Sequence, residues 1–252
     1  MTARTLAITS GKGGVGKTFV TANLACALAA RGQKVLVLDA DLGLANLDVV
    51  LNLHPKLTLH DVFTDKCTLE QAIVPAPGGF NVLLAGSGMV EYSRLTPEVR
   101  ERLLRIIEQV APRYDWVLID TGAGISDVVL YSVSLAQDVL VVATPEPTSL
   151  TDAYATIKVL ATQQERRSVG LVVNQAGRIG EGRTICTQLS AVLARFVAAK
   201  PGAQGFKLEL WGEVAIDPAV RQAVLKRQLL LEMLPGSDAA QGVKALATKL
   251  LA

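Results

Sequence analysis

The stretch SGKGGVGKT at residues 10–18 constrains the fold of this chain more than any other part of the sequence. It satisfies the pattern G-x-x-x-x-G-K-[ST]. The apolar run LAIT (6–9) precedes it, and FVTANLACALAARG follows it with apolar residues at helical spacing. A strand, a glycine-rich loop and a helix in this order are typical of a phosphate-binding loop. The alternative is an ordinary glycine-rich turn.

The residues of this loop suit phosphate chemically. Glycines let the backbone wrap closely around an anion, with N–H groups pointing inward, and the following helix adds partial positive charge at its N-terminus. Lys17 would reach the β- and γ-phosphates, and the hydroxyl of Thr18 would hold Mg²⁺. The predicted nucleotide-binding residues are Gly11, Lys12, Gly13, Gly14, Val15, Gly16, Lys17 and Thr18.

Lys12 is a second lysine in a loop that needs only one. A solvated surface lysine is the default interpretation. A second cation near Lys17 would repel it unless an anion lay between the two. One solution is that Lys12 points away from its own nucleotide and meets the phosphates of a neighbouring subunit.

Apolar runs alternate with helical patterns along the rest of the chain. The predicted strands are 6–9, 34–39, 81–86, 116–120, 138–144, 169–175 and 208–214, and the helices between them include 97–110 and 149–163. Several strands are apolar at consecutive positions, so both of their faces are buried. The sequence predicts one α/β domain over residues 1–252, doubly wound, with a mostly parallel central sheet and helices on both faces.

Composition excludes several other classes of protein. The 25 Lys and Arg nearly balance the 23 Asp and Glu, which gives no reason to predict specific nucleic-acid binding. Cys26, Cys67 and Cys186 are scattered and form no metal or redox motif. No signal peptide precedes the first strand, and no apolar run approaches the about 20 residues of a membrane span. We expect a cytoplasmic protein.

Acidic residues end two of the predicted strands. Asp39 and Asp41 follow KVLVL, where they could arrange Mg²⁺-bound water and orient an attacking water. Asp120 ends WVLI and fits the second acid of a phosphate-loop site, which reaches Mg²⁺ directly or through water. Asp39 could instead cap the following segment, and Asp41 could be a solvated turn residue.

Three further segments follow strands at the same predicted edge of the sheet. TGAGIS (121–126) could be a switch that senses the γ-phosphate, or a flexible turn. Asn174 ends the strand VGLVVN, and its amide suits the edge of an adenine ring. Asp217, in AIDPAV, lies at a similar position. Asn174 and Asp217 could equally be helix or turn caps.

The chain resembles the MinD/ParA family of dimerising ATPases over essentially its whole length, and four segments carry the resemblance. GKGGVGKT is similar to its deviant phosphate loop, LDADLGLANLD to its first switch and VLIDTGAGIS to its second. TPEPTSLTDAYATIK (144–158) is similar to the branch of flagellar-number regulators, FlhG/FleN.

The resemblance implies a role for each candidate residue. Lys12 matches the signature lysine, which crosses an ATP-sandwiched dimer to touch the partner's nucleotide. Lys17 and Thr18 match the phosphate and Mg²⁺ residues, and Asp41 matches the aspartate of the attacking water. Asp39 and Asp120 match acids of the Mg²⁺ region, and Asn174 matches an adenine-binding asparagine. Asp217 falls in a segment that approaches the base in the family, although the local sequence AIDP departs from the usual pattern.

Two departures from the family concern the ends of the chain. Many flagellar members carry an N-terminal extension that stimulates the GTPase FlhF, and we expect none here. Many members also end in an amphipathic membrane-targeting helix. In GSDAAQGVKALATKLLA, a Ser237 cap precedes Ala239, Val243, Leu246 and Leu250 on one face. We expect this helix to pack on the sheet, and any association with the membrane to be weak or partner-mediated.

The sequence therefore predicts a slow, partner-stimulated ATPase with ATP/ADP and Mg²⁺, which dimerises around ATP and regulates flagellar number, placement or gene expression. Expected partners are FlhF, a transcription regulator or a basal-body protein, with transient residence at the membrane or cell pole. The alternatives are a division-site or cargo-positioning ATPase and an ATP-binding module without turnover. An iron–sulfur carrier is disfavoured, because paired cysteines are absent.

Overall fold

A computed structural model of the chain describes residues 3–43, 46–86, 94–197 and 205–252. Its centre is one eight-stranded sheet with the order β3-β4-β2-β5-β1-β6-β7-β8. Neighbouring strands are parallel, except that β3 and β4 are antiparallel. The strands are β1 (Arg4–Ser10), β2 (Val35–Ala40), β3 (Val74–Pro75), β4 (Asn81–Leu83), β5 (Trp116–Ala123), β6 (Asp138–Ala143), β7 (Ser168–Ala176) and β8 (Lys207–Ala215).

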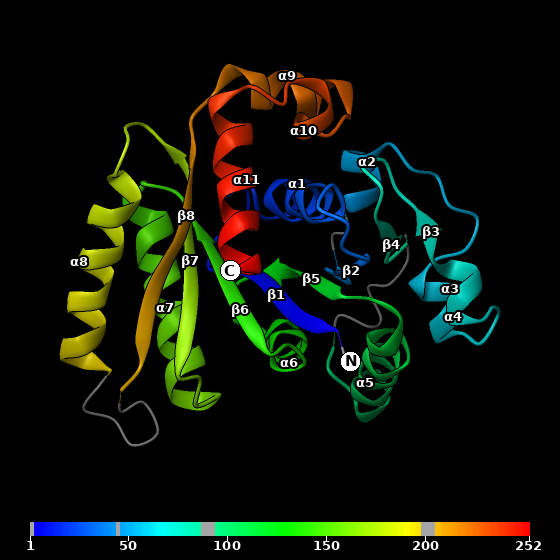
Figure 1. Cartoon of the computed structure of the whole chain (residues 1–252). Helices are drawn as coiled ribbons and strands as arrows, with labels where there is room; N and C mark the ends of the chain where they lie inside the picture. The colour runs from blue at the N-terminus through cyan, green and yellow to red at the C-terminus, as the bar shows by residue number, and fades with distance from the viewer. Residues whose placement is uncertain (1–2, 44–45, 87–93, 198–204) are drawn as a thin grey trace.

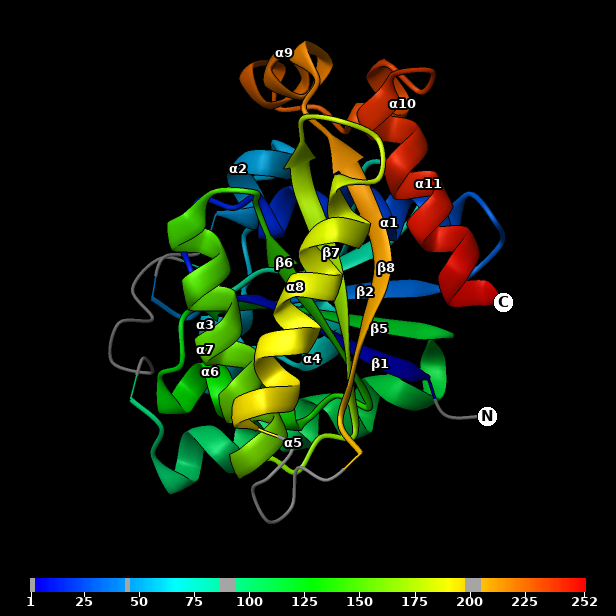
Figure 2. The ribbon, with the colours of Figure 1, turned by 90° about the vertical axis from the view of Figure 1, so that its left-hand side faces the viewer.

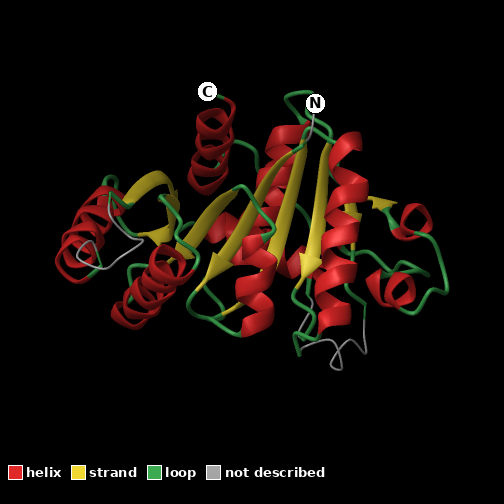
Figure 3. Ribbon diagram, turned by 90° about the horizontal axis from the view of Figure 1, so that it is seen from below, coloured by secondary structure: helices red, strands yellow, loops and turns green. Residues whose placement is uncertain are grey.

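Helices cover both faces of the sheet, as Figures 1 and 3 show. One face packs on α1 (Lys17–Ala29), α2 (Leu47–Leu51), α9 (Pro218–Lys226), α10 (Leu230–Met233) and α11 (Asp238–Leu251). The other packs on α3 (Leu59–Phe63), α4 (Leu69–Ala72), α5 (Pro97–Val110), α6 (Asp127–Ser134), α7 (Pro147–Gln163) and α8 (Glu181–Phe196). Figure 2 shows α7 and α8 side by side over β6, β7 and β8.

The strand β1 explains why the sheet needs helices on both sides. Leu6 and Ile8 enter the core shared with α1, whereas Ala7 between them enters the opposite core. Successive side chains of a strand point to opposite faces, so an unbroken apolar run requires two cores. The predicted α/β class with a mostly parallel sheet is confirmed.

The predicted elements differ from the observed ones mainly at their ends. The predicted helix 97–110 matches α5, whose Thr96 cap accepts a hydrogen bond from the backbone N–H of Val99. The helix predicted from residue 149 begins at Pro147, because proline is tolerated in a first helical turn. The strand predicted to end at Asp120 runs on to Ala123, and the two-residue β3 was not predicted.

The last helix packs on the sheet, as the sequence predicted. Ala239, Val243, Leu246 and Leu250 are all buried. A Cβ atom on Gly242 would lie 2.5 Å from the carbonyl oxygen of Glu213, so α11 lies directly against β8. Among the described residues, no helix is both long enough and apolar enough to cross a membrane.

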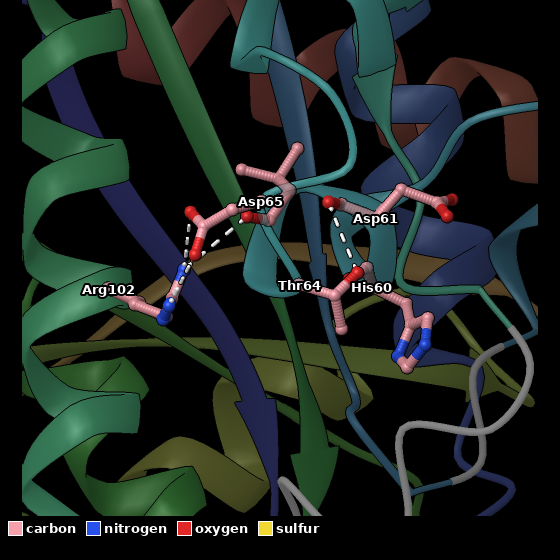
Figure 4. A network of polar contacts seen from close by, with 6 residues as sticks. His60, Asp61, Thr64, Asp65 and Arg102 are labelled. Atoms are coloured by element: carbon pink, nitrogen blue, oxygen red, sulfur yellow. Dashed lines mark hydrogen bonds and ion pairs between the residues drawn. The ribbon is translucent and has the colours of Figure 1, made fainter.

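The helices α3 and α5 both pack on the face of the sheet opposite α11, and a polar network joins them (Figure 4). Arg102 of α5 donates hydrogen bonds to both carboxylate oxygens of Asp65, at 3.1 and 2.9 Å. Asp65 follows α3 with a backbone φ of 56°. The ion pair therefore links the segment that leaves α3 to α5.

Candidate functional site

The glycine-rich loop connects the central strand β1 to α1. Gly14 and Gly16 both adopt left-handed backbone conformations, with φ of 79° and 90°, which favour glycine. Gly16 is the N-cap of α1, and Lys17 is its first residue. The loop therefore ends at a helix N-terminus, as a phosphate site requires.

Gly11 is required by a close approach of the loop to α7. A Cβ atom at this position would lie 2.2 Å from the carbonyl oxygen of Asp152, inside the α7 backbone. Helix backbone cannot move aside locally without breaking its own hydrogen bonds. The start of the loop is therefore fixed against α7, the helix whose first turn also contacts Lys12.

Lys12 is held by the start of α7. Its Nζ donates to Glu146 Oε2 and to Thr148 Oγ1, both at 2.9 Å. Lys17, in contrast, lines the pocket described next, and Lys12 is not among its lining residues. The two lysines of the loop thus have separate surroundings: Lys12 contacts the start of α7, whereas Lys17 lines the pocket.

A pocket of about 620 Å³ lies beside the loop. Its walls come from three segments that the sequence singled out, namely the phosphate loop, the segment after β2 and the end of β5. The lining residues include Gly13, Gly14, Gly16, Lys17, Thr18, Asp41, Gly43 and Gly122. This volume lies in the range of small-molecule and cofactor sites. Residues 44–45 of the first predicted switch lie outside the described residues.

Asp39 and Asp120 are buried neighbours behind this pocket. They are paired across β2 and β5, and their residues are only 1% and 2% exposed. Burial raises the pKa of Asp39 well above its usual value, and the nearby Asp120 raises it further. Burial also raises the pKa of Asp120, opposed by Lys17 and by the hydroxyls of Thr18 and Thr21.

This acidic pair fits a divalent cation. Asp39 Oδ2 is buried and has no hydrogen-bond partner among the described residues. The hydroxyl of Thr18, the predicted Mg²⁺ ligand, lies close enough to Asp120 to lower the pKa of that carboxyl. Mg²⁺ typically takes one or two carboxylates together with water and substrate phosphates. No described group of three or more His, Cys, Asp or Glu side chains is arranged to hold a metal alone, so the fit rests on Thr18 and the two aspartates.

The two predicted switch segments meet each other and the loop. A Cβ atom on Gly122 would lie 3.4 Å from Asp41 Oδ1, so the Asp41 carboxylate lies next to β5. The backbone N–H of Gly124, whose φ is 90°, donates to the carbonyl oxygen of Ser10 at 2.8 Å. The second segment therefore contacts the start of the phosphate loop directly, and the first segment contacts the second.

Asn174 lies behind the loop, at the carboxyl end of β7. Its Nδ2 donates to the carbonyl oxygen of Val15 at 2.8 Å. Asp217 is instead the N-cap of α9. Its two carboxylate oxygens accept from the backbone N–H groups of Ala219 and Ala239, at 2.8 and 3.2 Å. The cap interpretation that the sequence left open accounts for Asp217 without a ligand.

The sequence did not single out three residues that the structure places at the site. Glu146 and Thr148 lie in TPEPTS, where a carboxylate and a hydroxyl before a helix were the available signal. Thr21 donates to Asp120 Oδ1 at 3.0 Å and also contacts the carbonyl oxygen of Lys17. Its position four residues after Lys17, one helical turn along α1, could have indicated it.

The chain is similar to known proteins over nearly its whole length. A family model described as ParA, NUBPL iron-transfer P-loop NTPase, matches residues 1–251. The antiactivator FleN of Pseudomonas aeruginosa is 41% identical over 244 residues, 97% of this chain and 85% of FleN. The flagellum site-determining protein YlxH of Helicobacter pylori is 30% identical over 251 residues, 96% of this chain and 80% of YlxH.

A solved structure gives the same fold. The septum site-determining protein MinD of Pyrococcus horikoshii, complexed with Mg-ADP, superposes with a TM-score of 0.77 at 29% identity. The superposition covers 98% of this chain and 96% of that one.

Proposed function

Because the chain belongs to the ParA/MinD family of P-loop NTPases, we propose that it is a slow, Mg²⁺-dependent ATPase that works as a dimerising switch in the control of flagella. Family members are P-loop ATPases that typically dimerise around ATP. The separation of the two loop lysines carries the proposal: Lys17 lines the pocket, whereas Lys12 is held by Glu146 and Thr148 at the start of α7.

Each predicted residue has a task that its position supports. Lys17 would bind the phosphates, and Thr18, Asp39 and Asp120 would hold Mg²⁺. The ion would supply charge stabilisation at the γ-phosphate. Asp41, which lines the pocket next to Gly122, would orient the attacking water.

Lys12 would act across the dimer. It must first leave Glu146 and Thr148, which are both on its own chain. ATP can drive this exchange only if it binds the dimer more tightly than the monomer. After hydrolysis, Lys12 would bind Glu146 and Thr148 of α7 again. The contact between Lys12 and α7 would therefore be present in the monomer and absent from the ATP-bound dimer.

The flagellar role rests on FleN and YlxH, which are similar over nearly the whole chain. FleN is named an antiactivator, which suits a partner that is a transcription regulator. YlxH is named a flagellum site-determining protein, which suits a role in the placement of flagella. FlhF and a basal-body protein are further candidate partners, and a partner would accelerate hydrolysis. Contact with the membrane or cell pole would be transient.

A variant of Lys17 tests the proposal. Lys17→Ala should lose binding of Mg²⁺–ADP in calorimetry, whereas Lys12→Ala should retain it, because only Lys17 lines the pocket. The wild-type chain, expressed in a Pseudomonas aeruginosa strain without FleN, should change the number of flagella per cell, and Lys17→Ala should not. Tight binding by Lys17→Ala would contradict the site. An active ATPase with no effect on flagella would contradict the flagellar role alone.

A further inference from the structure

We infer that Asn174 is a positioning residue that holds the phosphate loop in its binding shape before the nucleotide arrives. This inference rests on the proposed nucleotide site and deepens it. The adenine-binding role, suggested by the resemblance, concerns the base, whereas the observed contact is with the backbone of the phosphate loop. The two roles can be separated by experiment.

The contact joins the loop to a rigid part of the sheet. Asn174 lies in β7, where it is paired with Val214 of β8, and it is 5% exposed. Its Nδ2 donates to the carbonyl oxygen of Val15 at 2.8 Å. Val15 is itself 3% exposed. The middle of the loop is therefore tied to the sheet by a buried hydrogen bond between two buried residues.

The loop needs such a tie, because glycine loses more backbone freedom on ordering than any other residue. Four of the six residues from Gly11 to Gly16 are glycine. Val15 lies between Gly14 and Gly16, which both have left-handed backbones. A restraint at Val15 therefore acts on the most freely rotating part of the loop. It lowers the ordering cost that phosphate binding would otherwise have to meet.

Gly16 makes room for the amide. A Cβ atom on Gly16 would lie 2.2 Å from Asn174 Nδ2, well inside the contact distance of any real pair of atoms. The glycine that ends the loop thus serves two needs, the left-handed φ of 90° and the approach of Asn174.

The amide has capacity beyond this contact. An asparagine amide offers two N–H donors and one carbonyl acceptor. The bond to Val15 uses one donor, so holding the loop does not prevent a contact with the base. The decisive question is whether the loss of Asn174 weakens a ligand that has phosphates but no base.

Inorganic pyrophosphate is that ligand. Calorimetry would compare Mg²⁺–pyrophosphate and Mg²⁺–ADP binding to the wild type, Asn174→Ala and the similarly sized Asn174→Leu. We expect both variants to bind both ligands about 2- to 10-fold more weakly, by the same factor, as the loss of one net hydrogen bond implies. Hydrogen exchange of the ligand-free variants should be faster across residues 11–16.

Asn23→Ala is the matched control. Asn23 is 1% exposed and donates to a backbone carbonyl oxygen, that of Phe19, at 2.9 Å, but it lies within α1. Its loss should lower the melting temperature and leave pyrophosphate affinity unchanged. If Asn23→Ala lost as much affinity for pyrophosphate as Asn174→Ala, general destabilisation of the fold would explain both losses. That result would overturn the inference.

The remaining outcomes are also decisive. If Asn174→Ala and Asn174→Leu bind pyrophosphate normally and only ADP weakly, Asn174 contacts the base and does not hold the loop. If both ligands bind normally, the contact has no role in binding. If the wild type binds neither ligand, the proposed nucleotide site itself fails.

Discussion

At the scale of single residues, the contact of Lys12 with α7 is the feature most open to test. The side chains of Lys12 and Glu146 are 38% and 63% exposed, so solvent screens the ion pair. Exposed pairs contribute about 0.2–1 kcal/mol. The contact can therefore bias the release of Lys12 without preventing it, which is what a reversible switch needs.

Glu146→Gln should release Lys12 more easily. If the ion pair opposes dimerisation, its removal from both chains should lower the dissociation constant of the ATP-bound dimer by about 2- to 30-fold, the equivalent of one exposed pair in each chain. Analytical ultracentrifugation with Mg²⁺–ATP would measure this. Glu101→Gln, which breaks an exposed pair with Arg105 on α5, is the control. A weaker dimer in Glu146→Gln would contradict the opposing role.

Asn174 and Asp217 show what the sequence could not decide at this scale. Both are polar residues at the ends of strands, and both suited either a ligand or a cap. Asn174 bonds Val15, which lies 159 residues away. Asp217 bonds the nearby Ala219 and also Ala239, which lies 22 residues away. The residue types predicted that each side chain would form hydrogen bonds. The fold of the chain determines which distant residue becomes the partner.

At the scale of elements, short helices depend on their first turns. The carboxylate of Asp61 in α3 accepts hydrogen bonds from the backbone N–H and the hydroxyl of Thr58, at 3.0 and 3.1 Å. Asp61 lies in the network of Figure 4. The bond from the Thr58 backbone lowers the pKa of Asp61 below its ordinary 3.8. The neighbouring α4 is held in the same way, but by the uncharged Gln71, which accepts from the N–H of Thr68.

Asp61→Ala should therefore destabilise the fold in a pH-dependent way. The folded pKa lies below the unfolded one, so the stabilisation is present above the unfolded value and is lost as the pH falls through the folded value. We expect a loss of at most about 1 kcal/mol at pH 7, because Asp61 lies close to solvent. Unfolding free energies at pH 7 and pH 3 would measure it.

Gln71→Ala provides the comparison, because an amide does not titrate. Its effect on the unfolding free energy should not depend on pH through residue 71. A loss in Asp61→Ala that is the same at both pH values would contradict the role of the carboxylate charge.

The sequence predicted the kinds of element better than their ends. WVLID indicated a buried strand, but β5 continues through Thr121, Gly122 and Ala123. Gly122 and Ala123 are residue types that are depleted in strands. Pairing with β1, in which Ala123 lies opposite Ser10, overrides it. The two-residue β3 gives no periodic signal, because its pairing with β4 depends on the turn between them.

At the scale of the whole molecule, strand order assembles the site. β1 lies between β5 and β6, with β2 beyond β5 and β7 beyond β6. Parallel strands present their carboxyl ends at one edge, which let the sequence predict that Lys17, Asp41 and Gly122 would converge. Because a parallel sheet fixes only which ends meet, the sequence could not show that α7 would hold Lys12.

The proposed switch requires that ATP join two copies of the chain through Lys12. Sedimentation of Asp41→Ala, which should bind ATP without hydrolysing it, tests this most directly. We expect a monomer with Mg²⁺–ADP, a dimer with Mg²⁺–ATP, and a monomer again with Mg²⁺–ATP when Lys12→Ala is added. An ATP-bound Asp41→Ala chain that stays monomeric, or a dimer that persists without Lys12, would contradict it.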